Sequence, residues 1–189
     1  MRIEAALVRS AARGAGARVR TTGMGARRSR AAASSLGEQP GDGLLVLGFC
    51  GGLDEQSRPG DVVVAEEVWA DGEEPGDGER IRCEGAPQLA MAVAGRGMRV
   101  RCGPVVSVAQ LALGERRAQL HAAGAIAVDM ESAWLAQGAR GRPFGVVRVV
   151  LDSPSHELLR PGVAIAGPRA ARALRRAAAA AVHGWAPGG

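Results

Sequence analysis

Apolar runs that stop abruptly at a glycine or a carboxylate recur along this chain of 189 residues. The strongest run, 144–151, reads Phe-Gly-Val-Val-Arg-Val-Val-Leu and is followed at once by Asp152. Shorter runs predict strands over 44–47, 61–65, 99–108 and 125–128, and Ala/Leu-rich segments predict helices over 111–123, 132–140 and 167–182. Strands that alternate with helices predict one α/β domain over residues 1–189, with a central mixed, mostly parallel sheet flanked by helices.

Composition excludes several classes of protein. Hydrophobic residues make up 47% of the chain and charged residues 23%, which suits a packed core and not a disordered chain. No apolar run approaches the roughly 20 residues that span a bilayer, and the first residues lack the apolar stretch of a secretory signal. The three cysteines, Cys50, Cys83 and Cys102, have no metal-ligand spacing. We therefore expect a cytoplasmic protein without disulfides, metal or organic cofactor.

The net charge of +5 raises the question of a nucleic-acid partner. All 24 basic residues are arginines, and a bias toward Ala, Gly and Arg is also typical of a GC-rich genome. The arginines are dispersed, and two phenylalanines and three tryptophans offer few stacking surfaces. We expect no nucleic-acid binding. A DNA affinity that falls steeply with salt concentration would instead indicate a nucleic-acid-binding protein.

Three predicted strands end in residues that suit a binding site. The first is followed by Gly-Phe-Cys-Gly-Gly at 48–52, the strand at 125–128 by Asp129 and Glu131, and the last by Asp152. Each pattern alone also suits an ordinary turn or helix start. In open α/β sheets, however, ligands bind at the carboxyl ends of strands. Three such ends on one edge therefore indicate a functional site, where burial would raise the pKa of Asp152 and suit it to donate a proton.

Four blocks of the sequence together resemble the purine nucleoside phosphorylase and nucleosidase superfamily. They are T-G-M-G at 22–25, G-F-C-G-G-L at 48–53 followed by P-G-D-V-V-V at 59–64, A-V-D-M-E-S-A at 127–133, and P-F-G-V-V-R-V-V-L-D at 143–152. The blocks follow the order of the family and cover about residues 20 to 155. The residues of these blocks are most similar to those of the hopanoid-associated phosphorylase branch. That branch is linked to removing adenine from adenosylhopane.

The resemblance implies cleavage of an N-glycosidic bond and assigns two carboxylates to it. Asp152 matches the acid that protonates the purine N7. Glu131 matches the carboxylate that holds the ribose 2′- or 3′-hydroxyl and stabilises the developing cation. Glu4 lies where the nucleosidases carry the glutamate that activates water.

The remaining contacts that the resemblance implies are to ribose, base and nucleophile. Met130 matches the apolar residue beside the ribose, and the segment from Val108 to Leu111, which contains Ala109, matches the base-stacking stretch. The turn that holds Phe49, Cys50 and Gly51 would supply backbone donors near the nucleophile. Gly25, in the early glycine turn, is a further expected substrate contact.

The chain departs from the family pattern in two places. Family members begin with a buried strand of the form I-G-I-I-x-A, whereas this sequence opens almost at the following helix. Either residues precede Met1 or the sheet lacks its first strand. In addition, Phe49 replaces the small hydroxyl residue that many relatives place against phosphate or water. This change favours hydrolysis or a lipid-like 5′ substituent over tight phosphate binding, and phosphate stays open as a co-substrate.

The expected partners are a small purine nucleoside and, by resemblance alone, further copies of the chain in a homo-oligomer. Within the enzyme class, a methylthioadenosine/adenosylhomocysteine nucleosidase and a purine nucleoside phosphorylase are the alternatives. Outside it, an inactive paralogue that binds a nucleoside without turnover is the alternative that an absent first strand favours.

Overall fold

The computed structural model describes residues 2–72, 76–155 and 163–187. Its helices are α1 (Arg2–Ala11), α2 (Ala26–Gly37), α3 (Ala86–Ala94), α4 (Glu115–Ala122), α5 (Ser132–Ala136), a 3₁₀ turn at Gln137–Ala139, and α6 (Val163–Gly184). Its strands are β1 (Leu44–Gly52), β2 (Val62–Asp71), β3 (Ile81–Arg82), β4 (Val100–Val108), β5 (Ala127–Asp129) and β6 (Phe144–Asp152). The expected α/β class is confirmed.

The six strands form one mixed sheet in the order β3-β2-β4-β5-β1-β6. An additional antiparallel pairing between Val62–Val64 of β2 and Val147–Val149 of β6 closes the sheet into a barrel. Three pairings are parallel and three are antiparallel. The sheet is thus mixed, as expected, but it closes into a barrel and is not plainly mostly parallel. The start of β2 pairs on both sides, with β4 and β6, and its register shifts between Ala65 and Val68, where the strand turns toward β3.

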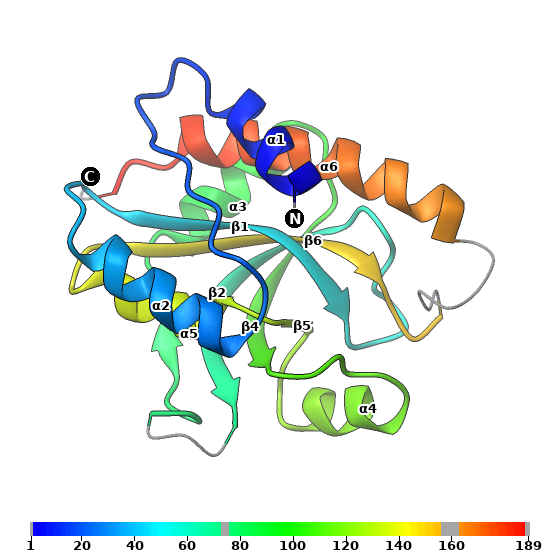
Figure 1. Ribbon diagram of the computed structural model, residues 1–189. Helices are drawn as coiled ribbons and strands as arrows, with labels where there is room; N and C mark the ends of the chain where they lie inside the picture. Colours follow the sequence, from blue (N-terminus) through cyan, green and yellow to red (C-terminus); the bar gives the residue numbers. More distant parts are fainter. Residues whose placement is uncertain (1, 73–75, 156–162, 188–189) are drawn as a thin grey trace.

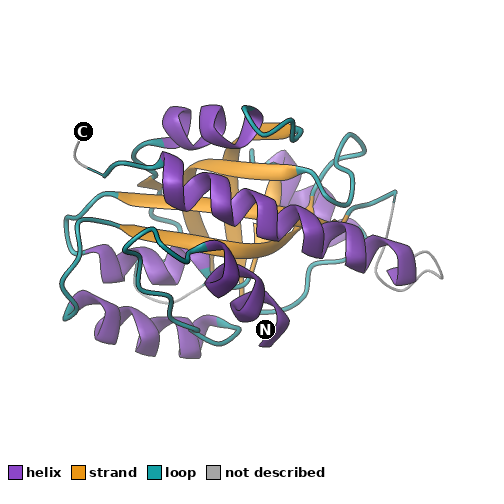
Figure 2. Cartoon of the chain, turned by 90° about the horizontal axis from the view of Figure 1, so that it is seen from above, coloured by secondary structure: helices purple, strands orange, loops and turns teal. Residues whose placement is uncertain are grey.

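Helices cover the sheet on two sides (Figures 1 and 2). On one side α1, α3 and α6 pack over β1, β2 and β6, and their buried side chains include Leu89, Val93 and Leu174. On the other side α2 and α5 pack against the opposite face, where Trp134 and Phe144 are buried. Helix α4 closes one end of the barrel through Leu120. β6 is buried almost throughout because both of its faces are covered, which explains its continuous apolar run.

Several elements differ from the prediction. Helices α2 and α3 were not predicted, because α2 buries only small residues and α3 is a short, alanine-rich segment that is apolar on most sides. α4 begins at Glu115 and not at Leu111, and α6 includes Pro168 in its interior instead of beginning there. Among the described residues, no strand precedes β1; α1 and an extended segment come before it.

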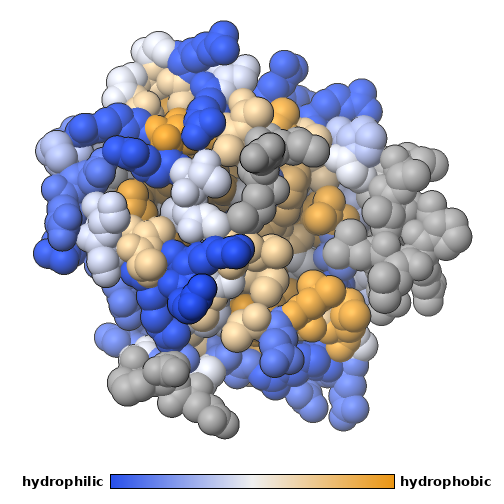
Figure 3. All heavy atoms as spheres, in the orientation of Figure 1, coloured by the Kyte–Doolittle hydropathy of each residue, from blue (hydrophilic) through white to orange (hydrophobic). Residues whose placement is uncertain are grey.

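No described helix is long and apolar enough to cross a membrane. The face drawn in Figure 3 is dominated by polar side chains, with apolar residues in small groups between them. The large hydrophobic side chains exposed on the described surface are Met24, Met91 and Leu111.

Candidate active site

The ends of β1, β5 and β6 meet at one place, as the sequence analysis predicts. Gly51 of β1 is in register with Val128 of β5 on one side and with Asp152 of β6 on the other. Cys50 lies beside them and is electrostatically coupled to both Asp129 and Asp152. The polar residues of three separate segments therefore gather at one edge of the barrel.

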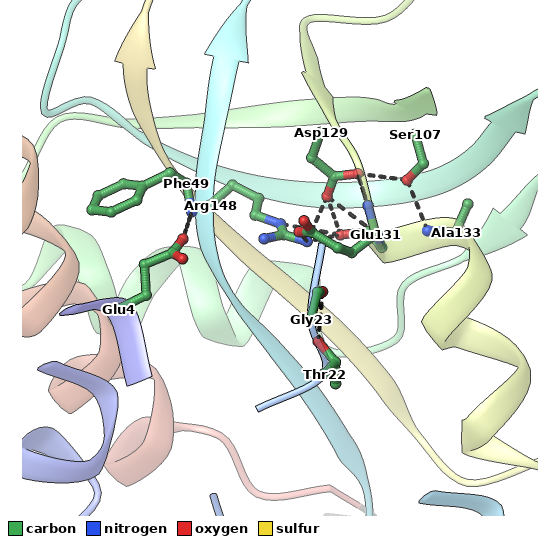
Figure 4. A network of polar contacts seen from close by, with 10 residues as sticks. Glu4, Thr22, Gly23, Phe49, Ser107, Asp129, Glu131, Ala133 and Arg148 are labelled. Carbon is green, nitrogen blue, oxygen red and sulfur yellow. Dashed lines mark hydrogen bonds and ion pairs between the residues drawn. The ribbon is translucent and has the colours of Figure 1, made fainter. Parts of the chain in front are cut away.

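A buried guanidinium forms the centre of the polar network in Figure 4. Arg148 projects from the middle of β6, and its Nη2 lies 2.7 Å from Asp129 Oδ2 and 3.1 Å from Glu131 Oε2. Its Nε and Nη2 also donate to Ser132 Oγ, at 3.1 and 2.9 Å. The network holds β6 against the segment that leads from β5 into α5.

Asp129 organises the start of α5. Its carboxylate accepts hydrogen bonds from the backbone N–H groups of Glu131 and Ser132, at 3.1 and 3.2 Å, and from the hydroxyl of Ser132. Ser107 Oγ, on β4, donates to Asp129 at 2.5 Å and accepts from the Ala133 N–H at 2.9 Å. Glu131 is the N-cap residue of α5, but Asp129 and Ser107 accept the N–H hydrogen bonds there, so the Glu131 carboxylate is left to face the cavity.

Glu4 and Glu131 face the same cavity, which has a volume of about 530 Å³. Glu4 projects from α1, and its Oε1 accepts a hydrogen bond from the Phe49 N–H at 3.2 Å. Glu4 thus joins Glu131 and Arg148 at the polar end of the cavity, and Figure 4 shows Thr22 and Gly23 beside them. The cavity continues between the extended segment 17–23 and the first half of β1.

The charges of this cluster are strongly coupled. Burial raises the pKa of Glu131; Arg148 opposes this shift, whereas Asp129 and Glu4 add to it. Burial disfavours the charge of Arg148, but the carboxylates of Asp129 and Glu131 outweigh it and raise the pKa of the guanidinium. The arginine is therefore the permanent cation of the site. Burial raises the pKa of the Cys50 thiol, which keeps it neutral.

Asp152 is 3% exposed, in keeping with the burial expected for it. Its Oδ2 accepts a hydrogen bond from Nη2 of Arg117, a residue of α4 that is itself 2% exposed. Burial alone would favour the protonated acid, whereas a paired guanidinium favours the carboxylate. The sequence pattern did not predict this cation, because Arg117 lies in a helix rich in exposed polar residues.

Two glycines leave room for these side chains. A Cβ at position 48 would lie 2.3 Å from Arg148 Nη1 and 3.4 Å from Glu4 Oε1. A Cβ at position 51 would lie 3.1 Å from Asp152 Oδ1 and 3.2 Å from Arg117 Nη2. The glycines of the 48–52 block therefore allow close approach of charged groups to the backbone of β1.

The other predicted site residues differ in whether they contact the polar cluster around Arg148 or line the cavity. Phe49 contributes its N–H to Glu4, while its ring packs among the apolar side chains between the sheet and α6. Met130 is half-buried between Asp129 and Glu131, and Ala109 is exposed just after β4. Gly25 is the N-cap of α2, whereas Gly23, two residues earlier, lines the cavity.

Sequence reasoning placed Asp129 at this edge but gave no role to Ser107, Arg148 or Arg117. For Arg148 a signal was present, since a charged residue inside an apolar strand must find a buried partner. Within the described residues, no cluster of three or more His, Cys, Asp or Glu side chains could hold a metal ion.

Residues 13–182 match the family model described as the phosphorylase superfamily. The chain belongs to the phosphorylase superfamily. This membership makes it an enzyme of the nucleosidase or phosphorylase type that cleaves N-glycosidic bonds, as the sequence blocks indicated. No curated protein matches the sequence.

Solved structures of the phosphorylase superfamily share the fold. A 5′-methylthioadenosine/S-adenosylhomocysteine nucleosidase from Neisseria meningitidis, in complex with methylthio-immucillin-A, has 22% identity and a TM-score of 0.76, over 98% of this chain and 96% of that one. The futalosine hydrolase of Helicobacter pylori has 18% identity and a TM-score of 0.70, over 96% and 91%. The nucleosidase of Campylobacter jejuni has 20% identity and a TM-score of 0.71, over 85% and 76%.

Proposed function

We propose that this enzyme releases adenine from an adenosine that carries a bulky apolar 5′ substituent. The observation that carries the proposal is the meeting of Asp152, Glu131 and Glu4 around the ends of β1, β5 and β6, in a member of the phosphorylase superfamily. The names of the structural neighbours, methylthioadenosine/adenosylhomocysteine nucleosidases and a futalosine hydrolase, support the class of reaction.

In the proposed reaction, the bond between C1′ and the purine nitrogen breaks and its electron pair leaves with the base. Asp152 transfers a proton to N7, which makes adenine a better leaving group. Glu131 binds the ribose hydroxyls, and its charge stabilises the ribosyl cation as it forms. Glu4 accepts a proton from the water that attacks the opposite face. Solvent then returns a proton to Asp152 and removes one from Glu4.

The cavity supports a large 5′ group. Its volume of about 530 Å³ lies within the range for drug-sized ligands. Beyond Glu4 and Glu131, its lining includes the apolar side chains of Val8, Ala12 and Leu45. Asp152 is not among the described residues that line it. We therefore place the ribose at Glu131, the base toward Asp152 and the 5′ substituent in the cavity; the hopane of adenosylhopane, in hopanoid biosynthesis, is such a group.

Methylthioadenosine is the second candidate substrate, because the Neisseria neighbour is a methylthioadenosine nucleosidase. The test measures adenine release from methylthioadenosine and from a long-chain 5′-alkyl adenosine, with and without phosphate. We expect kcat/KM to be at least about tenfold higher for the long chain, since each buried CH₂ contributes about 0.8 kcal/mol. We also expect no phosphate requirement. A strict requirement would identify a phosphorylase, and a folded protein that binds both nucleosides without releasing adenine would overturn the proposal.

A substitution in the cavity separates the two substrates. Ala12 is 6% exposed and lines the cavity, so Ala12→Phe should fill part of it. We expect this variant to lose activity on the long-chain substrate by about tenfold or more and to keep its activity on methylthioadenosine. Ala6→Phe, at an exposed position of α1, the helix that ends just before Ala12, is the control. Equal losses on both substrates would show that the 5′ group does not enter the cavity.

A further inference from the structure

Arg117 is a fully buried charge that the proposed reaction does not yet use. Its Nε donates to the Ala112 carbonyl at 3.0 Å and its Nη1 to the Gly52 carbonyl at 3.3 Å. Its Nη2 donates to Asp152. The guanidinium therefore joins the loop before α4, the end of β1 and the end of β6, and both carbonyls fix its plane.

Three elements of the described chain bring charged or titratable groups close to Asp152. Arg117 approaches from α4, and Cys50 faces it from β1. Asp129, at the end of β5, is coupled to the same thiol, but it is paired with Arg148. Because the thiol of Cys50 is neutral, Arg117 supplies positive charge to Asp152 within the part of the chain that the structure describes. The cluster thus contains two buried pairs, Arg148–Asp129 and Arg117–Asp152, with Cys50 between them.

We propose that Arg117 is a positioning residue that holds Asp152 as an oriented carboxylate in the resting site and thereby sets the upper pH limit of catalysis. The inference rests on the proposed function, in which Asp152 is the general acid. Before each turnover Asp152 takes one proton from solvent, and during cleavage it passes that proton to N7. The carboxylate that remains is the form that Arg117 stabilises, so the pair favours completion of the proton transfer.

The Arg117–Asp152 ion pair predicts the direction in which the pH profile of the cleavage rate shifts when the pair is removed. Cleavage needs the protonated acid, so the rate falls as the pH rises through the titration of Asp152. An adjacent guanidinium favours the carboxylate and lowers the pH of this titration. Without the guanidinium, the buried carboxyl of Asp152 would lose the ion pair that favours its charged form and would hold its proton to higher pH. Arg117→Met should therefore move the falling limb of the profile upward.

The test follows the Asp152 carboxyl by carbon-13 NMR in wild type and Arg117→Met, with the signal assigned by its loss in Asp152→Asn. We expect the titration to move up by roughly one to three pH units in Arg117→Met, with the falling limb of kcat for adenine release moving by the same amount. Arg117→Lys, which keeps the charge, should move both by less. Arg99→Met is the control, because Arg99 pairs with the buried Asp61, just before β2, and should leave the titration of Asp152 unchanged.

Unchanged titration of Asp152 in folded Arg117→Met would overturn the inference and leave Arg117 a purely structural role. If Arg117→Met does not fold, wild type decides: titration of Asp152 below the ordinary aspartate range of about 4 supports the pairing, and titration above it overturns the inference. Absence of adenine release from wild type would instead contradict the proposed function, since the NMR titration does not depend on turnover.

Discussion

At the scale of single residues, Arg148 is a buried charge that the surrounding fold must neutralise and hydrogen-bond. A guanidinium in the middle of an apolar strand is costly to bury, and it is retained here because Asp129, Glu131 and Ser132 surround it. The same charge holds Glu131 at the polar end of the cavity. In the proposed reaction, stability and ribose binding would therefore depend on one set of contacts.

Replacing Arg148 should be strongly destabilising. Arg148→Met would leave Asp129 and Glu131 without their cation, and we expect the free energy of unfolding to fall by about 3–5 kcal/mol. Urea denaturation of the variant and of wild type measures this loss. Arg172→Met, at an exposed position of α6, is the control and should change stability by less than about 0.5 kcal/mol. A similarly small effect for Arg148→Met would show that the network does not stabilise the protein.

The sequence identified the carboxylates of the site better than its cations. Asp152 and Glu131 follow buried strands directly, and such positions predict a sheet-edge site. Arg117 has no such signal, because neighbouring Arg116 has the same local pattern but lies exposed on the helix surface. Only the packing of α4 against the ends of β1 and β6 distinguishes the two arginines.

At the scale of elements, the segment after β1 is fixed to β4 by a partly buried ion pair. Arg101 Nη1 and Nη2 lie 2.9 and 2.6 Å from the two carboxylate oxygens of Asp54, and Arg101 also donates to Ser57 Oγ at 2.6 Å. This contact holds the residues that follow Gly52, at the rim of the site. Burial opposes the charge of Asp54, but the hydrogen bonds from Arg101 and Ser57 lower its pKa to about 2.

This pair should make stability depend on pH. The pKa of Asp54 is lower in the folded state than its ordinary value of 3.8. Its contribution is therefore present above about pH 4 and is lost as the pH falls toward 2. We expect Asp54→Asn to lower the free energy of unfolding by about 2 kcal/mol at pH 7 and by much less near pH 2, as measured by urea denaturation. Asp42→Asn, at an exposed position, is the control; a loss for Asp54→Asn that does not depend on pH would contradict the assignment.

Strands were easier to predict than helices in this chain. The runs of β1, β4 and β6 are apolar because the sheet is covered on both sides. Helix α2 reads Ala-Arg-Arg-Ser-Arg-Ala-Ala-Ala-Ser-Ser-Leu-Gly, and it buries only Ser29 and Ala33. A helix that buries small residues shows no clear periodicity of large apolar residues in the sequence. For this reason α2 was not predicted.

At the scale of the whole molecule, closure of the barrel could not be predicted from the sequence. It depends on Val62–Val64 pairing with both β4 and β6, and on the bend of β2 after Ala65. These pairings join segments far apart in the chain, whereas apolar patterns report only local structure. The α/β class and the meeting of three strand ends followed from the pattern, but strand directions did not.

The expected homo-oligomer remains a prediction at this scale. Arginines are spread over the surface, and the exposed apolar side chains Met24, Met91 and Leu111 are single residues. Light scattering after gel filtration should give at least twice the chain mass of 19.3 kDa. A mass of 19.3 kDa that is independent of concentration would contradict the expected assembly.

The central claim is that the cluster at the ends of β1, β5 and β6 cleaves an N-glycosidic bond with Asp152 as the acid. The most direct measurement is the single-turnover rate of adenine release by wild type, Asp152→Asn and the exposed-carboxylate control Glu84→Gln. We predict that Asp152→Asn lowers the rate by about 10²–10⁴-fold and that Glu84→Gln leaves it unchanged. Adenine release at the wild-type rate by Asp152→Asn would contradict the account.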